Sequence, residues 1–133
     1  MSYIIATVSE IKNVESLHYV TFTCHKQNLS MISLELDKDV QIDKKVKLVV
    51  KSSHVAIAKE FTGLVSYANQ LAMTVHSINK GKLLCSVTLE FFDMFIESII
   101  TRDASEKMSL TSGDHITVFI KASEIAICEI LDD

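Results

Sequence analysis

Apolar and polar residues alternate along most of the chain with the period of two that is typical of half-buried β-strands. Four segments follow this pattern and are rich in β-branched and aromatic residues: HYVTFTC (18–24), KVKLVVKS (45–52), LCSVTLEFF (84–92) and HITVFIKAS (115–123). Segments 39–44 and 102–110 are predicted instead as a short helix or helical turn. The second has Asp103 near its start and Gly113 beyond its end, as a short capped helix would. The sequence therefore predicts a mainly β protein.

The strand pattern occurs twice, because KSSHVAIAK (51–59) returns as KASEIAICE (121–129). Further upstream, Thr7-Val8 aligns with Thr74-Val75 at an offset of 67 residues, whereas the lysine motif needs an offset of 70. We interpret residues 1–62 and 63–133 as two diverged repeats, each with four or five short strands and one helical turn. They predict two tandem OB-like small Greek-key barrels. A helix over residues 56–71 remains an alternative for the connection between the repeats.

The charge balance limits the classes of partner. The 133-residue chain is 48% hydrophobic and 23% charged, with a formal net charge of −4. A negative molecule repels nucleic acid, so any anion it binds must be held by a local site. Its apolar stretches are too short for a membrane span, and its first residues lack the features of a signal peptide. We expect a cytoplasmic protein with neither nucleic-acid nor membrane partners.

Residues with metal-binding or catalytic chemistry are scattered along the chain. Cys24, Cys85 and Cys128 show no CxxC spacing and are predicted as small reduced core residues. The five histidines form no ligand motif, and no activated Cys–His pair is apparent. Glu35 and Asp37 share a predicted strand face and are read as solvated, not as an acid–base pair. We therefore expect a protein that is not an enzyme and uses neither a cofactor nor a metal ion.

The segment LEFFDMFIESII (89–100) is more apolar than one face of a small barrel requires. Among Phe91, Phe92, Met94 and Phe95, two side chains are expected to face away from their own core. Exposed apolar surface of this kind usually marks an interface. The segment predicts subunit packing in a homo-oligomer in preference to a hydrophobic ligand pocket.

Several motifs of the second repeat resemble a known family. SYANQLAMTV (66–75) is similar to the opening of the Mop or TOBE-type molybdate-binding module, and IIT (99–101), SLTSGD (109–114) and KASEIAI (121–127) follow in that module's order and spacing. Two copies in tandem resemble a di-Mop protein of the molbindin kind. The resemblance implies a homo-oligomer, a trimer, in which molybdate or tungstate lies at interfaces between modules.

The resemblance also implies which residues bind the oxyanion, with one site per repeat. They are Ser66, Thr101, Ser105, Lys121, Ala122 and Ser123 in the second repeat, and Lys51, Ser52 and Ser53 in the first. A tetrahedral dianion is held by hydroxyls, backbone N–H groups and one or two cations, each charge-assisted bond being worth roughly 1.5–3 kcal/mol.

Two positions depart from the family pattern: Ala68 stands where the family has arginine, and Ala104 where it has serine. The preferred hypothesis is a small cytoplasmic oxyanion-binding protein for molybdate or tungstate storage or homeostasis. The alternative is an oligomeric interaction or regulatory module of the same fold with degenerate anion sites. An enzyme that uses the OB-like cleft is a remoter third.

Overall fold

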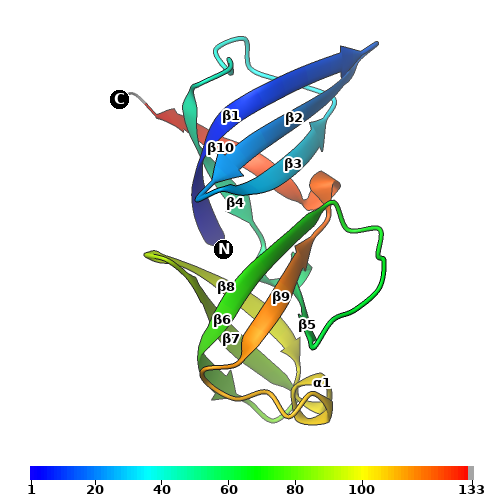
Figure 1. Cartoon of the computed structure of the whole chain (residues 1–133), viewed down its shortest axis with the longest axis vertical. Coiled ribbons are helices and arrows are strands. Elements are labelled where there is room, and N and C mark those ends of the chain that lie inside the picture. Colours follow the sequence, from blue (N-terminus) through cyan, green and yellow to red (C-terminus); the bar gives the residue numbers. More distant parts are fainter. Residues whose placement is uncertain (132–133) are drawn as a thin grey trace.

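The protein forms two curled antiparallel sheets that stack along its long axis (Figure 1). The computed structural model describes residues 1–131. The first sheet, in spatial order, contains β10 (Ile125–Leu131), β4 (Lys45–Val50), β1 (Ser2–Val14), β2 (Leu17–Cys24) and β3 (Gln27–Ser33). The second contains β5 (Ala56–Lys59), β9 (His115–Ile120), β6 (Asn69–Lys80), β7 (Leu84–Phe91) and β8 (Met94–Thr101). The predicted mainly β, OB-like two-barrel fold is confirmed.

Three short helical elements complete the fold: the 3-10 turns η1 (Ser52–His54) and η2 (Ala122–Glu124), and the helix α1 (Arg102–Lys107). Thr101 begins α1 as its N-cap, because its hydroxyl accepts a hydrogen bond from the backbone N–H of Ala104 at 3.1 Å. Within residues 1–131, none of these helices has the length and apolar composition needed to cross a membrane.

Alternation along each strand builds the core. Ile4, Ala6 and Val8 of β1 are buried, whereas Tyr3 and Ile5, at alternate positions, are exposed. The inward-facing residues of β2, β4, β6 and β7 follow the same rule, and β9 departs from it only at Phe119, which is also buried. Buried side chains of both sheets form one continuous cluster. The alternation seen in the sequence is therefore the packing pattern of two small barrels that share a junction.

The two sheets exchange their last strands. β5, which ends the first repeat, pairs with β9 of the second sheet, and β10, which ends the second repeat, pairs with β4 of the first sheet. The boundary predicted between residues 62 and 63 lies in the connection from β5 to β6. It remains a prediction about the repeats in the sequence, because each sheet contains strands from both sides of it.

Each exchanged strand carries a charged residue that lies near a residue of opposite charge in the barrel it joins. Lys59 at the end of β5 lies 3.1 Å from the carboxylate of Asp114 in the second barrel, and its ammonium also donates to the carbonyl of Ser109 at 2.9 Å. Glu129 of β10, at the position equivalent to Lys59, lies opposite Lys47 of β4. Pairing of each strand within its own repeat would instead bring Lys59 to the lysine-rich β4, so charge favours the exchange.

We expect the Asp114→Asn variant to lower the melting temperature at pH 7 by about 2–4 °C, since the contact is partly solvent-exposed. Hydrogen bonds from Thr111, together with Lys59, hold the pKa of Asp114 below its usual range. A lowered pKa in the folded state gives stability that is present above the unfolded-state pKa, about 3.9, and is lost as the pH falls through the folded-state pKa. Thermal melts from pH 7 to pH 2.5 should therefore converge for the variant and the wild type at the acid end. Asp103→Asn, which removes a fully surface-exposed pair with Lys107, is the control and should change little.

In the loops, two local predictions are wrong and one alternative fails. Residues 39–44 form turns and no helix, because the side chain of Asp37 accepts from the backbone N–H of Asp39 at 2.8 Å and Asp43 has a φ of 75°. Glu35 and Asp37 lie in this loop and not on a strand. The helical alternative for 56–71 also fails, since the segment is strand, loop and strand.

The cysteines divide into two groups. Cys24 and Cys85 are buried as predicted, and burial raises the pKa of the Cys24 thiol, to which the charge of Asp93 adds. Cys128 contradicts the prediction of a core position, because it is exposed. The register between β10 and β4 shifts between Ile127 and Glu129, which leaves Cys128 as the extra residue of a bulge.

Candidate functional site

The two Lys–small–Ser motifs form matching turns at the junction of the barrels. Lys51 and Lys121 directly follow β4 and β9 in an extended conformation. The carbonyl of each accepts from the N–H three residues later, on His54 and Glu124, at 2.9 Å. Each turn packs against the barrel formed mainly by the other repeat: η1 against β8, and η2 against β3. The repeated motif is thus a repeated junction between barrels.

Two small pockets lie beside these turns, and each combines both repeats. A pocket of about 210 Å³ is lined by Lys121 together with Ser53 and Tyr67. The equivalent pocket, of about 230 Å³, is lined by Lys51 together with Ser123. Each pocket is therefore lined by the lysine of one repeat and the serine of the other repeat.

His54 and Glu124 lie between the pockets and line both of them. The Nδ1 atom of His54 is 2.8 Å from a carboxylate oxygen of Glu124, and both side chains are 37% exposed. They occupy equivalent positions in the two repeats, so the pair sits where the repeats meet. Sequence reasoning treated His54 as isolated; the alignment of the two motifs, which sets a histidine on a glutamate, was the signal that could have found the pair.

Ser52 is buried and lines neither pocket. Its Oγ makes no hydrogen bond of normal geometry, although it lies close enough to Glu97 to contribute to the lowered pKa of that carboxyl. The larger cause of this lowered pKa is a hydrogen bond from the hydroxyl of Ser86. A carboxylate beside Ser52 repels an anion, so the hydroxyl of Ser52 is poorly placed as a ligand. Ala122, at the equivalent position, offers no hydroxyl.

The other predicted ligands are spread over the second barrel. Ser66 is exposed in the loop before β6, next to Tyr67 of the Lys121 pocket. Thr101 and Ser105 belong to α1, which lies at the end of the second barrel away from the junction (Figure 1). The Thr101 hydroxyl caps α1, and Ser105 is a buried residue of this helix. One chain therefore brings together Lys121, Ser53 and the Ser66 loop, but not α1.

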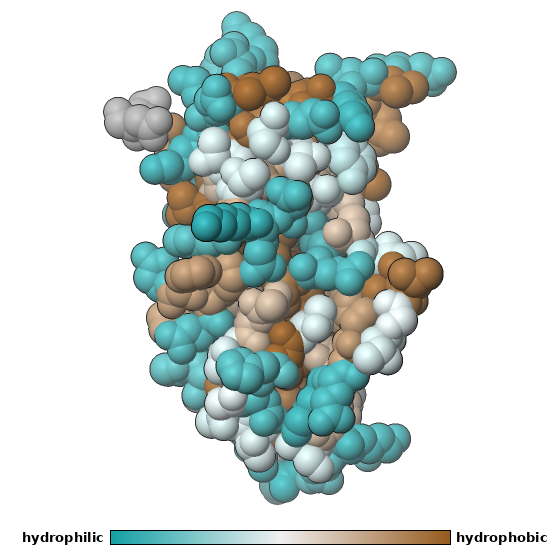
Figure 2. Space-filling view, in the orientation of Figure 1, coloured by the Kyte–Doolittle hydropathy of each residue, from teal (hydrophilic) through white to brown (hydrophobic). Residues whose placement is uncertain are grey.

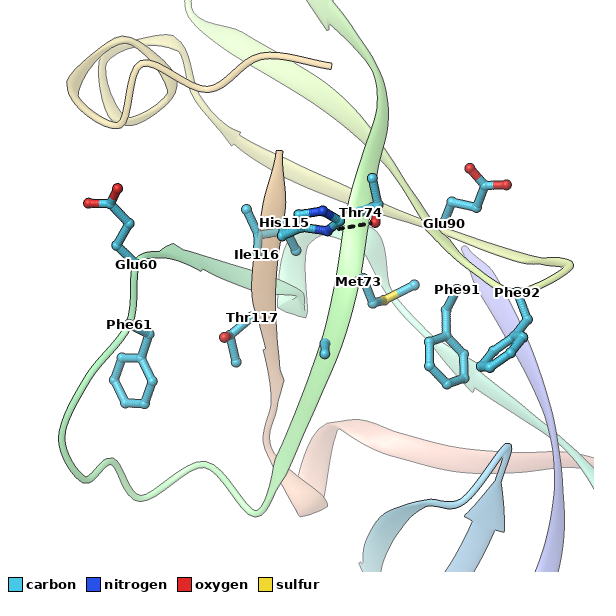
Figure 3. A pocket seen from close by; sticks show the side chains of 11 residues that line it. Glu60, Phe61, Met73, Thr74, Glu90, Phe91, Phe92, His115, Ile116 and Thr117 are labelled. Atoms are coloured by element: carbon cyan, nitrogen blue, oxygen red, sulfur yellow. Dashed lines mark hydrogen bonds between the residues drawn. The ribbon is translucent and has the colours of Figure 1, made fainter. Parts of the chain in front are cut away.

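A larger hollow on the outer face of the second sheet contains none of the predicted ligands. Figure 3 shows its lining, with Phe91 and Phe92 on one side, Phe61 and Glu60 on the other, and Thr74 hydrogen-bonded to His115 between them. Its volume is about 450 Å³. Among the described residues, no lysine or arginine lines this hollow, whereas Glu60 and Glu90 do.

The fold and the junction pockets define a protein built from two small OB-like β-barrels that exchange strands. Residues 66–127 match the family model described as TOBE domain, which confirms the predicted resemblance. The whole chain is similar to the crystal structure of the cytoplasmic molybdate-binding protein ModG with molybdate bound. The identity is 27% and the TM-score 0.87, over 94% of this chain and 93% of that chain. A search of curated proteins gave no match.

Proposed function

We propose that this protein binds a small tetrahedral oxyanion, molybdate or tungstate, and serves its storage or homeostasis in the cytoplasm without catalysis. One observation carries the proposal: two equivalent pockets at the barrel junction, each with one lysine and one serine contributed by different repeats. The similarity to ModG along the full chain supports a molybdate-class ligand. A lysine supplies the charge, and hydroxyls and backbone N–H groups supply the directional bonds.

Assembly would complete the sites. Since Thr101 and Ser105 lie far from the lysines of their own chain, a neighbouring copy would have to supply the hydroxyls of α1. The apolar hairpin between β7 and β8 favours such contacts: Phe91 is buried, whereas Phe92 and Phe95 are 66% and 48% exposed. We propose a homo-oligomer, a trimer, built partly on these two rings.

The double variant Phe92→Asn/Phe95→Thr is expected to reduce the oligomer to monomers in light scattering at micromolar concentration. Phe92 has a φ of 56°, which asparagine tolerates, so the turn should be preserved. Because the contact is apolar, the wild-type mass should persist at about 1 M salt. Leu64→Asn is the matched control. This residue is fully exposed in the β5–β6 connection, where apolar surface reaches the right-hand edge of Figure 2, yet lies outside the hairpin. A wild-type protein of monomeric mass would refute the proposed assembly.

An oligomeric interaction module with degenerate anion sites is the second candidate. The observation in its favour is that Glu124 adds negative charge to both pockets. In addition, Ala68 and Ala104, at the positions where the family pattern has arginine and serine, supply no donor side chain. Calorimetry with molybdate, tungstate and sulfate separates the two functions. Saturable heat with molybdate or tungstate supports oxyanion binding. If none of the three anions gives heat at millimolar concentration, the result favours the interaction module.

A further inference from the structure

The pockets of the barrel junction hold little net positive charge. Each contains one lysine, Lys51 or Lys121, and each also borders the carboxylate of Glu124. With His54 neutral, the lysine and the glutamate cancel in the Lys121 pocket. The Lys51 pocket is also lined by Met1, which carries the amino terminus. A dianion brought into either pocket then meets a like charge at short range, in a setting where the pair is only 37% exposed and screening by water is incomplete.

Protonation of His54 changes this balance in both pockets at once. The imidazole of His54 contacts Glu124 at 2.8 Å, so a proton on the ring neutralises the carboxylate and leaves the lysine charge for the anion. Histidine is the side chain whose ordinary titration range spans physiological pH. The other charged groups around His54 are Lys51 on its own turn, Lys121 across the Lys121 pocket, and the amino terminus and Glu97 near η1. The lysines and the amino terminus favour a bound anion, and Glu97 opposes it.

We propose, resting on the oxyanion-binding function above, that the His54–Glu124 pair links oxyanion binding to proton uptake. His54 takes a proton from solvent as the anion enters, and the pair thereby sets the pH range in which both pockets bind. By linkage, a ligand that prefers the protonated form is bound more tightly as the pH falls, and its binding in turn draws protons onto that form.

The test is calorimetry of the full chain with molybdate at pH 6 and pH 8. The wild type should bind about fivefold more tightly at pH 6, in line with a charge change on one histidine. At pH 7, the measured enthalpy should depend on the ionisation enthalpy of the buffer, which reports proton uptake directly. His54→Gln should abolish both effects. Glu124→Gln should tighten binding at pH 8, because it removes the opposing charge while keeping the shape of the side chain.

His76→Gln is the control. His76 forms a similar partly exposed pair with Glu90, 3.5 Å apart, but lines neither junction pocket, so its variant should keep the wild-type pH dependence. Measurable binding of equal strength at pH 6 and pH 8, without a buffer effect, would overturn the proton linkage and leave the oxyanion function intact. Absence of heat at both pH values would overturn the oxyanion function, and the proton linkage with it.

Discussion

Replacing Lys121 with alanine is expected to abolish molybdate binding in the pocket that Lys121 shares with Ser53. Lys121 is the only lysine lining this pocket among the described residues, and the arginine of the family pattern is replaced by Ala68. A dianion held by hydroxyls alone would lose its hydration without gaining a counter-charge, which is a large uncompensated cost. In calorimetry, the number of molybdate ions bound per chain should fall by the number that this pocket binds. Lys51→Ala should in the same way remove binding in the other pocket.

Serine variants separate charge from hydrogen bonding in the same experiment. Ser53→Ala should weaken the Lys121 pocket, and Ser123→Ala the Lys51 pocket, by about tenfold each, or roughly 1.4 kcal/mol. Lys107→Ala on α1 serves as the lysine control, since it removes a surface lysine that contacts only Asp103 in the ion pairs of the described chain. If Ser123→Ala instead affected the same pocket as Lys121→Ala, the composite arrangement would be refuted.

Cutting the chain between residues 64 and 65 is expected to leave two fragments that fold only together. Fragment 1–64 lacks β10 and cannot complete the sheet edge at β4, and fragment 65–133 lacks β5 at β9. The exposed edges and the uncovered core, including the buried Ile125 and Val55, would leave each fragment without stable structure as a monomer. Circular dichroism of the separate fragments should show little ordered structure, and equimolar mixing should restore the spectrum and a complex with one copy of each.

A control distinguishes strand exchange from non-specific association of the fragments. A chain cut in this loop after folding should keep the mass of the intact protein in native solution and separate only in denaturant. Two independently folded monomeric fragments would show that each barrel closes with its own last strand, which contradicts the exchange.

Much of the local structure could be predicted from sequence because strand pattern is a local property. The period-two alternation in KVKLVVKS and HITVFIKAS indicated the strands that became β4 and β9, and Asp103 and Gly113 indicated the neighbourhood of α1. The failures were also local. Polar segment 39–44 follows turn chemistry set by Asp37, and Cys128 is turned outward by a one-residue bulge that alternation alone does not reveal.

The candidate site could be predicted only in part. The sequence pointed to Lys51, Lys121, Ser53 and Ser123, and these residues do line pockets at the junction. It did not indicate which lysine faces which serine, nor that His54 meets Glu124. Those contacts depend on how the two turns approach each other across the junction, and no spacing within one motif encodes that approach.

What the sequence by itself determined is the pair of repeats, the strand content of each, and the residues that face inward, because side-chain alternation and burial act over a few neighbouring positions. What only the tertiary structure decided is the exchange of β5 and β10 and the composite pockets that result. The runs VAIA and IAIC have the same local pattern, and either could pair with β4 or with β9. The choice lies in long-range contacts such as Lys59 with Asp114, which stabilise the fold only when segments 55 residues apart come together.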